Sequence, residues 1–355
     1  MLKKMNKTTK NNLITYAMVI LAFVIMQILI SAGSISSLLQ GLMVPLCTYI
    51  ILAVSLNLVV GILGELSLGH AGFMCVGAFT SAFFSKCTRD VIASDGLRFF
   101  LALLIGIVTA AIFGMLIGIP VLRLKGDYLA IVTLAFGEII KNMVNVLYIG
   151  KDSKGFHVTT KDVMALNMDA DGTVILNGPQ GITGTPKNST FVIGFILILL
   201  TLFIVQNLIN SRDGRAIMAI RDNRIAAESI GINITKYKLM AFTISAAMAG
   251  AAGVLYAHNI STLTANTNNF GYNMSITILV FVVLGGIGNI RGSIIAAVVL
   301  TLLPELLRGL NDYRMLIYSI VLIVMMLFNW SPKFITLREK YSPKNLFRKN
   351  AKEEE

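Results

Sequence analysis

Charged residues are scarce in this sequence, and long stretches have none. Asp, Glu, Lys and Arg make up only 14% of its 355 residues, while hydrophobic residues make up 55%. Soluble domains carry about 25% charged residues. The runs 13–31 and 257–290 contain no charged residue, and an apolar run of about 20 residues matches the hydrocarbon thickness of a bilayer. The sequence therefore predicts an all-α polytopic membrane protein and excludes a soluble domain.

Cysteine and the common catalytic motifs are also rare or absent. The three cysteines lie in or at the ends of apolar segments, and their spacing suits neither a metal site nor a disulfide framework: Cys47, Cys75 and Cys87. We interpret them as small packing residues. The phosphate-loop pattern G-x-x-x-x-G-K-[ST] is missing, because the only Gly-Lys pair, Gly150-Lys151, is followed by aspartate. No Cys/His metal cluster and no nucleophile–base arrangement occurs. The sequence predicts no catalytic residue, no metal site, no cofactor and no ATP hydrolysis by this chain alone.

The apolar segments predict about ten transmembrane helices. They fall at 13–31, 42–61, 69–86, 98–119, 128–149, 190–209, 239–258, 273–288, 293–308 and 314–330. The first is longer than the 7–15-residue core of a signal peptide, so we expect it to be retained. The two segments at 273–288 and 293–308 are the shortest.

The basic residues that give the net charge of +12 gather in alternate loops. This is the positive-inside pattern of a plasma-membrane protein and needs no nucleic-acid partner. It predicts a cytoplasmic N-terminus (1–12), a transmembrane domain (13–330) and a cytoplasmic C-terminal tail (331–355). Two loops are long. The outer loop 150–189 is rich in Gly, Asp, Asn and Thr, and the cytoplasmic loop 210–238 is basic.

Residues 61–79, GILGELSLGHAGFMCVGAF, place glycines and polar residues inside apolar sequence. Glycine weakens a helix by about 1 kcal/mol relative to alanine. The pattern predicts a broken or re-entrant segment whose free backbone groups face a cavity, where transporters often hold a solute. The candidate solute contacts here are Glu65, Ser67, Gly69, His70 and Gly72. The alternative is that the glycines only allow close helix packing, with His70 bonded to a neighbouring backbone group.

Glu138 is a further candidate for the substrate pathway, because an ionisable residue within a membrane span is costly and often functional. Lys141 follows it at i+3, so the two side chains are equally suited to pair along one helix face. Glu305 and Arg308 repeat that spacing near the outer surface, where pairing is favoured. A second glycine cluster, VVLGGIGNIRGSIIAA at 282–297, indicates a tight turn and close packing.

The cytoplasmic loop predicts one amphipathic helix from 214 to 231. At 3.6 residues per turn, one mostly apolar stripe holds Ala216, Ile220, Asn223, Ala227 and Ile230. Another face holds Arg221, Arg224 and Glu228. Gly231 stands where a helix stop is expected. Such a helix lies on lipid headgroups or inserts into a partner's groove, and the small side chains without Trp or Phe favour a protein groove.

Five blocks of the sequence, in order, resemble one family. They are GELSLGHAGFMCVGAF, LRLKGDYLAIVTLAFGEIIK, LNGPQGI, GRAIMAIRDNRIAAESIGI leading into KLMAFTISAAMAGAAGVLY, and VLGGIGNIRGS. Together they are similar to the LivM-type permease subunit of bacterial branched-chain amino acid ABC importers, from about residue 42 to 330. The outer loop 150–189 is longer than the resemblance leads us to expect. It either adjusts docking of a binding protein or is a plain insertion.

The resemblance implies a non-catalytic permease with several partners. These are a second homologous permease, two cytoplasmic ATPase subunits that carry ATP and Mg, and an extracellular or periplasmic solute-binding protein. It also implies that the 214–231 helix is the coupling helix that contacts an ATPase, through Gly214, Arg215, Ala216, Ile220, Arg221, Arg224, Ala227, Glu228 and Gly231. A bulky charged residue at Ala227 is then expected to uncouple the ATPase.

Three other functions remain to be compared with transport of leucine, isoleucine or valine. Urea and short-amide importers use similar permeases, and the sequence does not separate an aliphatic pocket from an amide one. A proton-coupled secondary transporter would use Glu65, His70 and Glu138 as a relay, but it has no need of an amphipathic inner helix. A structural or receptor-like protein leaves the broken segment unexplained.

Overall fold

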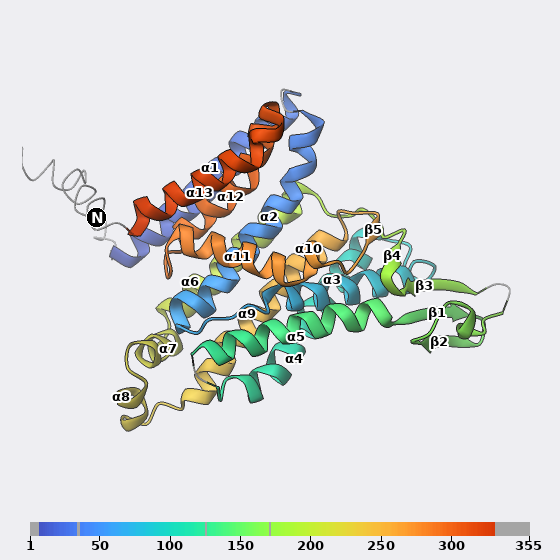
Figure 1. Cartoon of the computed structure of the whole chain (residues 1–355), viewed down its shortest axis with the longest axis horizontal. Coiled ribbons are helices and arrows are strands. Elements are labelled where there is room, and N and C mark those ends of the chain that lie inside the picture. Colours follow the sequence, from blue (N-terminus) through green and yellow to red (C-terminus); the bar gives the residue numbers. More distant parts are fainter. Residues whose placement is uncertain (1–6, 34–35, 125, 170–171, 331–355) are drawn as a thin grey trace, which may run out of the picture.

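The computed structural model describes residues 7–33, 36–124, 126–169 and 172–330 (Figure 1). The predicted cytoplasmic tail 331–355 lies outside them, as does the start of the predicted N-terminal segment. The helices, in chain order, are α1 (Lys7–Ser31), α2 (Ser37–Asn57), the π-helix η1 (Leu58–Leu63), α3 (His70–Cys87), α4 (Asp95–Val121), α5 (Asp127–Val146), α6 (Phe191–Asn210), α7 (Arg212–Asp222), α8 (Arg224–Ser229), α9 (Ile234–Ala257), α10 (Thr267–Phe270), α11 (Tyr272–Gly285), α12 (Ile290–Leu306), the 3-10 helix η4 (Leu307–Tyr313) and α13 (Arg314–Trp330).

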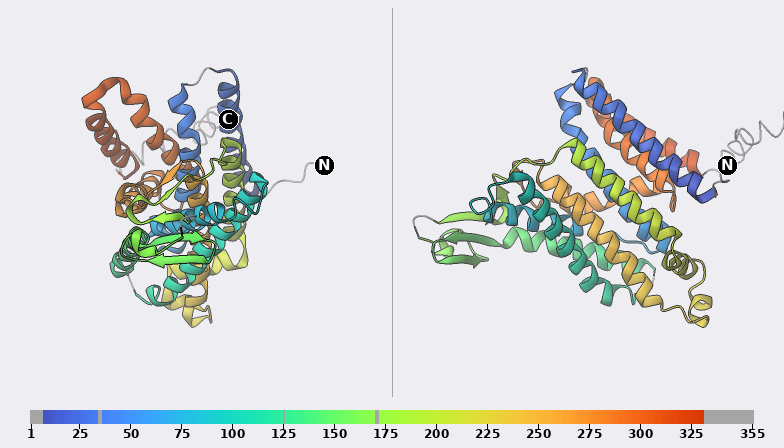
Figure 2. Two further views of the ribbon diagram at one scale, coloured as in Figure 1. Left: turned by 90° about the vertical axis from the view of Figure 1, so that its right-hand side faces the viewer. Right: turned by 180° about the vertical axis from the view of Figure 1, so that it is seen from behind.

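Eight helices in the described ranges are long and apolar enough to cross a membrane. This confirms the all-α polytopic membrane fold. The spans predicted at 69–86 and 314–330 correspond to α3 and α13, which are not among those eight. The count of about ten therefore stays a prediction. Figures 1 and 2 show α1, α12 and α13 together along one side of the bundle, with α4 and α5 on the opposite side.

Much of the predicted outer loop is folded, which the sequence did not predict. The strands β1 (Tyr148–Asp152), β2 (Gly155–Thr159) and β3 (Thr173–Asn177) form an antiparallel sheet in the order β2-β1-β3. The short strands β4 (Ile182–Thr183) and β5 (Thr262–Leu263) pair with each other, and two 3-10 turns, η2 (Met164–Leu166) and η3 (Gly178–Gln180), complete the region. The sheet extends from one end of the bundle, while α7 and α8 lie at the other (Figure 1).

The hairpin turn between β1 and β2 is organised by one carboxylate. Asp152 Oδ1 accepts hydrogen bonds from the backbone N–H groups of Lys154 and Gly155, at 2.8 and 3.0 Å. His157 Nε2 lies 2.9 Å from Asp152 Oδ2, and the N–H of Asp169 donates to that same oxygen. Desolvation acts to raise the pKa of the Asp152 carboxyl, but these hydrogen bonds outweigh it and hold the pKa below its usual value.

This sheet is expected to lose stability in acid. Because the folded-state pKa of Asp152 is depressed, its stabilising effect is complete above the ordinary pKa of about 3.9 and disappears as the pH falls through the folded-state pKa. Hydrogen-exchange protection factors of Lys154 and Gly155, corrected for intrinsic rates, should therefore drop below about pH 4. An Asp152→Ala variant should show low protection at neutral pH as well. Unchanged wild-type protection in acid would contradict this role of Asp152.

The core is built around α9, which crosses α3 and α4 through small residues. A Cβ atom on Gly253 would lie 2.1 Å from the carbonyl oxygen of Met74, and one on Gly77 would lie 2.4 Å from the carbonyl oxygen of Gly250. Without a side chain at these positions the helix backbones touch. Small residues serve the same purpose throughout membrane bundles, where dispersion rather than hydrophobic burial holds helices together.

Gly253→Ala is expected to destabilise the protein by about 1–3 kcal/mol, because the added methyl group requires α3 and α9 to separate. The midpoint of thermal unfolding in detergent should fall accordingly. Gly41→Ala is the matched control, since Gly41 lies within α2 and a methyl group added there would have no atom within 4 Å. That change is expected to leave stability unchanged or to raise it by up to about 1 kcal/mol. Equal midpoints for the two variants would refute the close crossing.

Candidate functional site

The glycine-rich segment breaks between η1 and α3, over residues 64–69. Gly64 ends the π-helix with φ +80, a left-handed conformation that glycine adopts at no steric cost. The N–H of Glu65 closes the turn on the carbonyl of Val59 at 3.1 Å. The break is therefore narrower than the predicted 61–79. Residues 61–63 belong to η1, and His70 already starts α3.

The backbone groups around the break bond to side chains from distant helices. The N–H of Leu68 donates to Thr133 Oγ1 at 3.0 Å, and the N–H of Ala71 donates to Ser275 Oγ at 3.1 Å. Arg221 Nη1 donates to the carbonyl of Gly61 at 2.9 Å. The prediction that free backbone groups face a cavity is wrong for these three groups, because α5, α11 and α7 supply polar side chains within hydrogen-bond distance.

The glycines of the break allow α3 and α5 to touch. A Cβ on Gly69 would lie 2.2 Å from the carbonyl oxygen of Thr133, and one on Gly72 would lie 2.7 Å from Gly137 Cα. Both positions are buried. The close-packing interpretation of these glycines therefore has direct structural support.

His70 and Ser67 are both buried beside the break. His70 Nε2 lies 2.7 Å from Ser55 Oγ on α2, so the ring bonds to a hydroxyl group rather than to the backbone group that was expected. Ser67 Oγ is buried and has no hydrogen-bond partner among the described residues. A solute role for either side chain stays a prediction.

Glu65 forms an ion pair with Lys238 near the start of α9. Lys238 is 4% exposed, and the Glu65 side chain is 14% exposed. Lys238 was not predicted as a partner from the sequence, because 173 residues separate the two positions. Its one local signal is a lysine directly before an apolar span, which is a common pattern at cytoplasmic helix ends.

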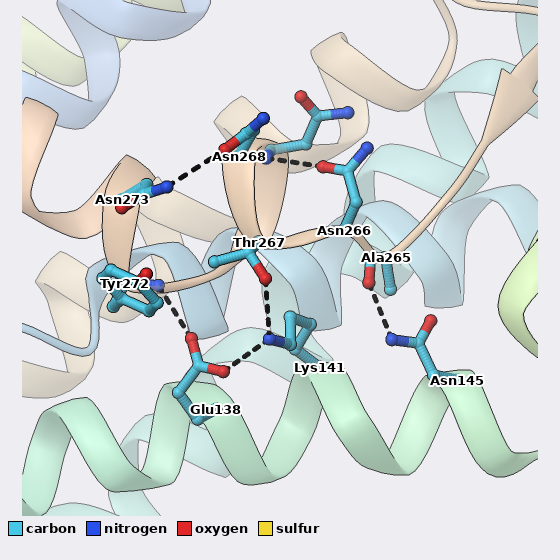
Figure 3. A network of polar contacts seen from close by, with 10 residues as sticks. Glu138, Lys141, Asn145, Ala265, Asn266, Thr267, Asn268, Tyr272 and Asn273 are labelled. Atoms are coloured by element: carbon cyan, nitrogen blue, oxygen red, sulfur yellow. Dashed lines mark hydrogen bonds and ion pairs between the residues drawn. The ribbon is translucent and has the colours of Figure 1, made fainter.

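Glu138 and Lys141 pair along α5, as the i+3 spacing suggested, and also hold a second element (Figure 3). Lys141 Nζ donates to Glu138 Oε2 at 2.5 Å and to Thr267 Oγ1 at 3.2 Å. Glu138 Oε1 accepts from the N–H of Tyr272, the first residue of α11, at 2.8 Å. A carboxylate is favourable at a helix N-terminus. This network fastens α10 and α11 to α5.

The other predicted pair is also present. Arg308 Nη1 donates to Glu305 Oε1 at 3.1 Å, with 57% of the Arg308 side chain exposed. The pairing interpretation of this spacing is therefore confirmed for both pairs.

The loop predicted to be cytoplasmic contains two helices where one was predicted over 214–231. α7 ends at Asp222 and α8 starts at Arg224. Asn223 between them is extended, at φ −155 and ψ 103, and its side chain accepts a hydrogen bond from the N–H of Ala226 at 3.0 Å. The one-helix prediction is wrong because asparagine is a strong N-cap and competes with helix continuation. Gly231, at φ +86, follows the end of α8 near the predicted stop.

The bend also changes which side chains face outward. Ile220 and Ala227 are buried with Ile234 in a small core of their own, whereas Ile225 is 80% exposed and Ile230 is 74% exposed. The predicted stripe is therefore only partly correct. Of its members, Ile220 and Ala227 are buried, Ala216 is half-buried, and Asn223 and Ile230 are exposed. A substitution at Ala227 tests the folding of the loop rather than a contact with a partner.

The remaining predicted coupling residues lie on both sides of the loop. Gly214 is buried, and a Cβ there would lie 2.0 Å from the carbonyl oxygen of Leu208. The exposed or half-buried members are Arg215, Arg221, Arg224 and Glu228. Two large apolar side chains, Ile225 and Ile230, are thus exposed in the same loop as these charged residues.

Two apolar cavities lie elsewhere in the bundle. One, of about 460 Å³, lies between α1, α2, α6 and α12. The other, of about 600 Å³, lies between α3, α4, α5 and the sheet. Neither is lined by a residue of 61–72. A zwitterionic solute needs convergent polar groups, which these almost wholly apolar walls do not supply. Within the part of the chain that the structure describes, no group of three or more His, Cys, Asp or Glu side chains is arranged to hold a metal ion.

Comparison with known proteins identifies the family. Residues 37–328 match the family described as branched-chain amino acid transport system / permease component. The high-affinity branched-chain amino acid transport system permease protein LivM of Salmonella typhimurium is 35% identical over an alignment of 361 residues, gaps included. The alignment covers 92% of this chain and 75% of the relative. The LivM protein of Escherichia coli is 33% identical with the same coverage.

A second kind of permease is also related. The LivH permease protein of the Escherichia coli high-affinity branched-chain amino acid system is 24% identical over 287 residues, covering 79% of this chain and 89% of that protein. No solved structure matches the chain. The chain belongs to the permease-component family of branched-chain amino acid transport systems, and it is an integral membrane protein.

Proposed function

We propose that this chain is the LivM-like subunit of an ATP-binding cassette importer that moves leucine, isoleucine or valine across the plasma membrane. The observation that carries the proposal is the identity of 33–35% to LivM permeases over 92% of the chain. The permease forms the path and undergoes the conformational change, while ATP and Mg are bound by separate subunits. The chain itself then needs no nucleotide site, in agreement with the missing phosphate loop.

The proposed ATPase contact is the tip of the α7–α8 loop. Ile225 and Ile230 are large, apolar and exposed there, and the same loop carries the charged residues Arg221, Arg224 and Glu228. Apolar anchors within a polar rim are typical of a docking surface for a protein groove. In this proposal α7 and α8 lie in the cytoplasm, together with the N-terminus and the C-terminal tail. The sheet of residues 148–177 lies outside, where a solute-binding protein would dock.

The proposed second permease is a LivH-like chain. The similarity of this chain to LivH extends over most of both proteins, and two related permeases facing each other enclose a path between them, as repeated units do in other transporters. We place the cytoplasmic end of that path at the break. Gly64 and Leu66 are exposed there, and the break contacts α7 through Arg221. The wall would include Ser67, Gly69, His70 and Gly72, with Glu138 farther along α5, whereas Glu65 is paired with Lys238.

Uptake by the reconstituted importer tests this function. Vesicles holding this chain, the second permease, the ATPase subunits and the binding protein should accumulate labelled leucine only when ATP is supplied on the side of the ATPase subunits. Excess isoleucine or valine should compete, and urea should not. Competition by urea alone would favour the short-amide alternative. Uptake that a protonophore abolishes and ATP depletion leaves intact would instead support a secondary transporter.

A further inference from the structure

We propose that Arg221 and Lys238 clasp the break between η1 and α3 and transmit movement of the ATPase-docking loop to it. The clasp consists of Arg221 with Gly61 and of Lys238 with Glu65. Both cations are positioning residues for ATP-driven transport rather than solute contacts. The proposal rests on the proposed function, since it requires that α7 and α8 receive the force of ATP hydrolysis.

The first half of the clasp is both polar and steric. Arg221 Nη1 donates to the carbonyl of Gly61 at 2.9 Å, which ties the last turn of α7 to the π-helix. The stem of the same side chain lies against Gly64, where a Cβ atom would come within 2.5 Å of Arg221 Cγ. Arg221 Nη2 also bonds Asp222 Oδ1 at 2.9 Å, which holds the guanidinium group in place. Because Arg221 contacts Gly61 and Gly64 directly, a displacement of α7 is expected to displace the end of η1 as well.

The second half of the clasp holds the other side of the break. Lys238 lies one turn into α9, and its ammonium group pairs with the Glu65 carboxylate. The pair is largely removed from water, since the two side chains are 5% and 14% exposed. Such a pair resists separation, because parting the charges leaves each one buried and unpaired. Arg221 and Lys238 flank the loop that contains α8. Both ends of that loop therefore contact the same short segment, residues 61–65.

The far side of η1 is anchored to a different part of the bundle. Asn57 Oδ1 accepts from the N–H of Gly288 at 2.9 Å, and Asn57 Nδ2 donates to Ser293 Oγ at 2.9 Å. These contacts join the last residue of α2, directly before η1, to the turn between α11 and α12 and to the first turn of α12. The break thus lies between the loop that the clasp holds and the helices that Asn57 holds. A displacement of the loop must either move the break or open these contacts.

The neutral pair Glu65→Gln/Lys238→Met tests the clasp in the whole reconstituted importer. Removing both charges leaves no unpaired ion in the membrane, so the variant is expected to assemble and to hydrolyse ATP near the wild-type rate. Leucine taken up per ATP hydrolysed should fall by about ten-fold, the size of a typical coupling between two sites. Lys238→Arg keeps the cation and should retain most of the uptake. Lys236→Met is the matched control, because Lys236 is exposed on the same helix. This variant should take up leucine at the wild-type ratio to ATP hydrolysed.

Two results would overturn the clasp. One is uptake per ATP by the neutral pair within about two-fold of wild type, which would mean no coupling through these charges. The other is a Lys238→Arg variant as poor as the neutral pair, which would show that side-chain shape rather than charge is required. Failure of the proposed function gives a different pattern. In that case the wild-type chain itself retains no ATPase subunits, and its uptake does not depend on ATP.

Discussion

Aspartate at Ile225 and Ile230 together is expected to release the ATPase subunits from the permease complex while the chain stays folded in the membrane. Both side chains are about three-quarters or more exposed, so the change removes no internal packing. It does place two carboxylates in the apolar groove that the proposed contact requires. Central apolar anchors of an interface are worth about 2 kcal/mol or more each, so the loss of two should weaken binding well over a hundred-fold. The amount of ATPase subunit that co-purifies with tagged permease measures this loss of binding.

Val91→Asp provides the control for that experiment. Val91 is 79% exposed and Ile225 is 80% exposed, but Val91 lies in the turn between α3 and α4 rather than in the α7–α8 loop. ATPase retention should be unchanged in this variant. Full retention by the Ile225→Asp/Ile230→Asp variant would show that α8 is not the docking surface. A bulky charge at Ala227 is a poorer test, because Ala227 belongs to the small core with Ile220 and Ile234.

Glu138→Ala is expected to destabilise the protein by about 3 kcal/mol, which is typical of breaking a buried ion pair. It leaves the Lys141 ammonium group, only 9% exposed, with the Thr267 hydroxyl as its hydrogen-bond partner. It also removes the acceptor for the first N–H of α11. The double variant Glu138→Gln/Lys141→Met should cost about 1 kcal/mol or less, because no charge is left unpaired and the glutamine oxygen still accepts from Tyr272. Unfolding midpoints in detergent measure both effects.

The pair at Glu305 and Arg308 is the control for the Glu138 experiment. It has the same spacing, but 57% of the Arg308 side chain is exposed. Glu305→Ala should therefore change stability by less than about 1 kcal/mol. A Glu138→Gln variant with unchanged stability and abolished, protonophore-sensitive uptake would contradict the structural role. That result would support the proton-relay alternative for Glu138.

Features that depend on neighbouring residues were predictable from the sequence. The apolar runs matched the helices because hydrocarbon thickness sets their length. The pairs at 138/141 and 305/308 followed from helical spacing. Gly231 follows the end of α8, and glycine is favoured there because its φ is positive. Close packing was one of the two interpretations offered for the glycines of the break, and the contact of Gly72 with Gly137 supports it.

Features that depend on residues far apart in the sequence were not predictable from it. Glu65 and Lys238 meet only because α9 runs beside the break, and no local pattern in the sequence states this. The one-helix prediction for residues 214–231 failed at Asn223, where side-chain capping outweighed the 3.6-residue periodicity. The sheet β2-β1-β3 was missed because its strands are only five residues long, and turn residues obscure their alternation.

The most direct test of the central claim is to purify this chain from its native membranes in mild detergent and to identify its partners by mass spectrometry. We predict a second, homologous permease together with ATP-binding subunits. A solute-binding protein recovered with them should carry leucine, isoleucine or valine. A stable chain that purifies alone, with no ATPase subunit in any detergent that preserves its fold, would contradict the assignment as an ABC importer permease.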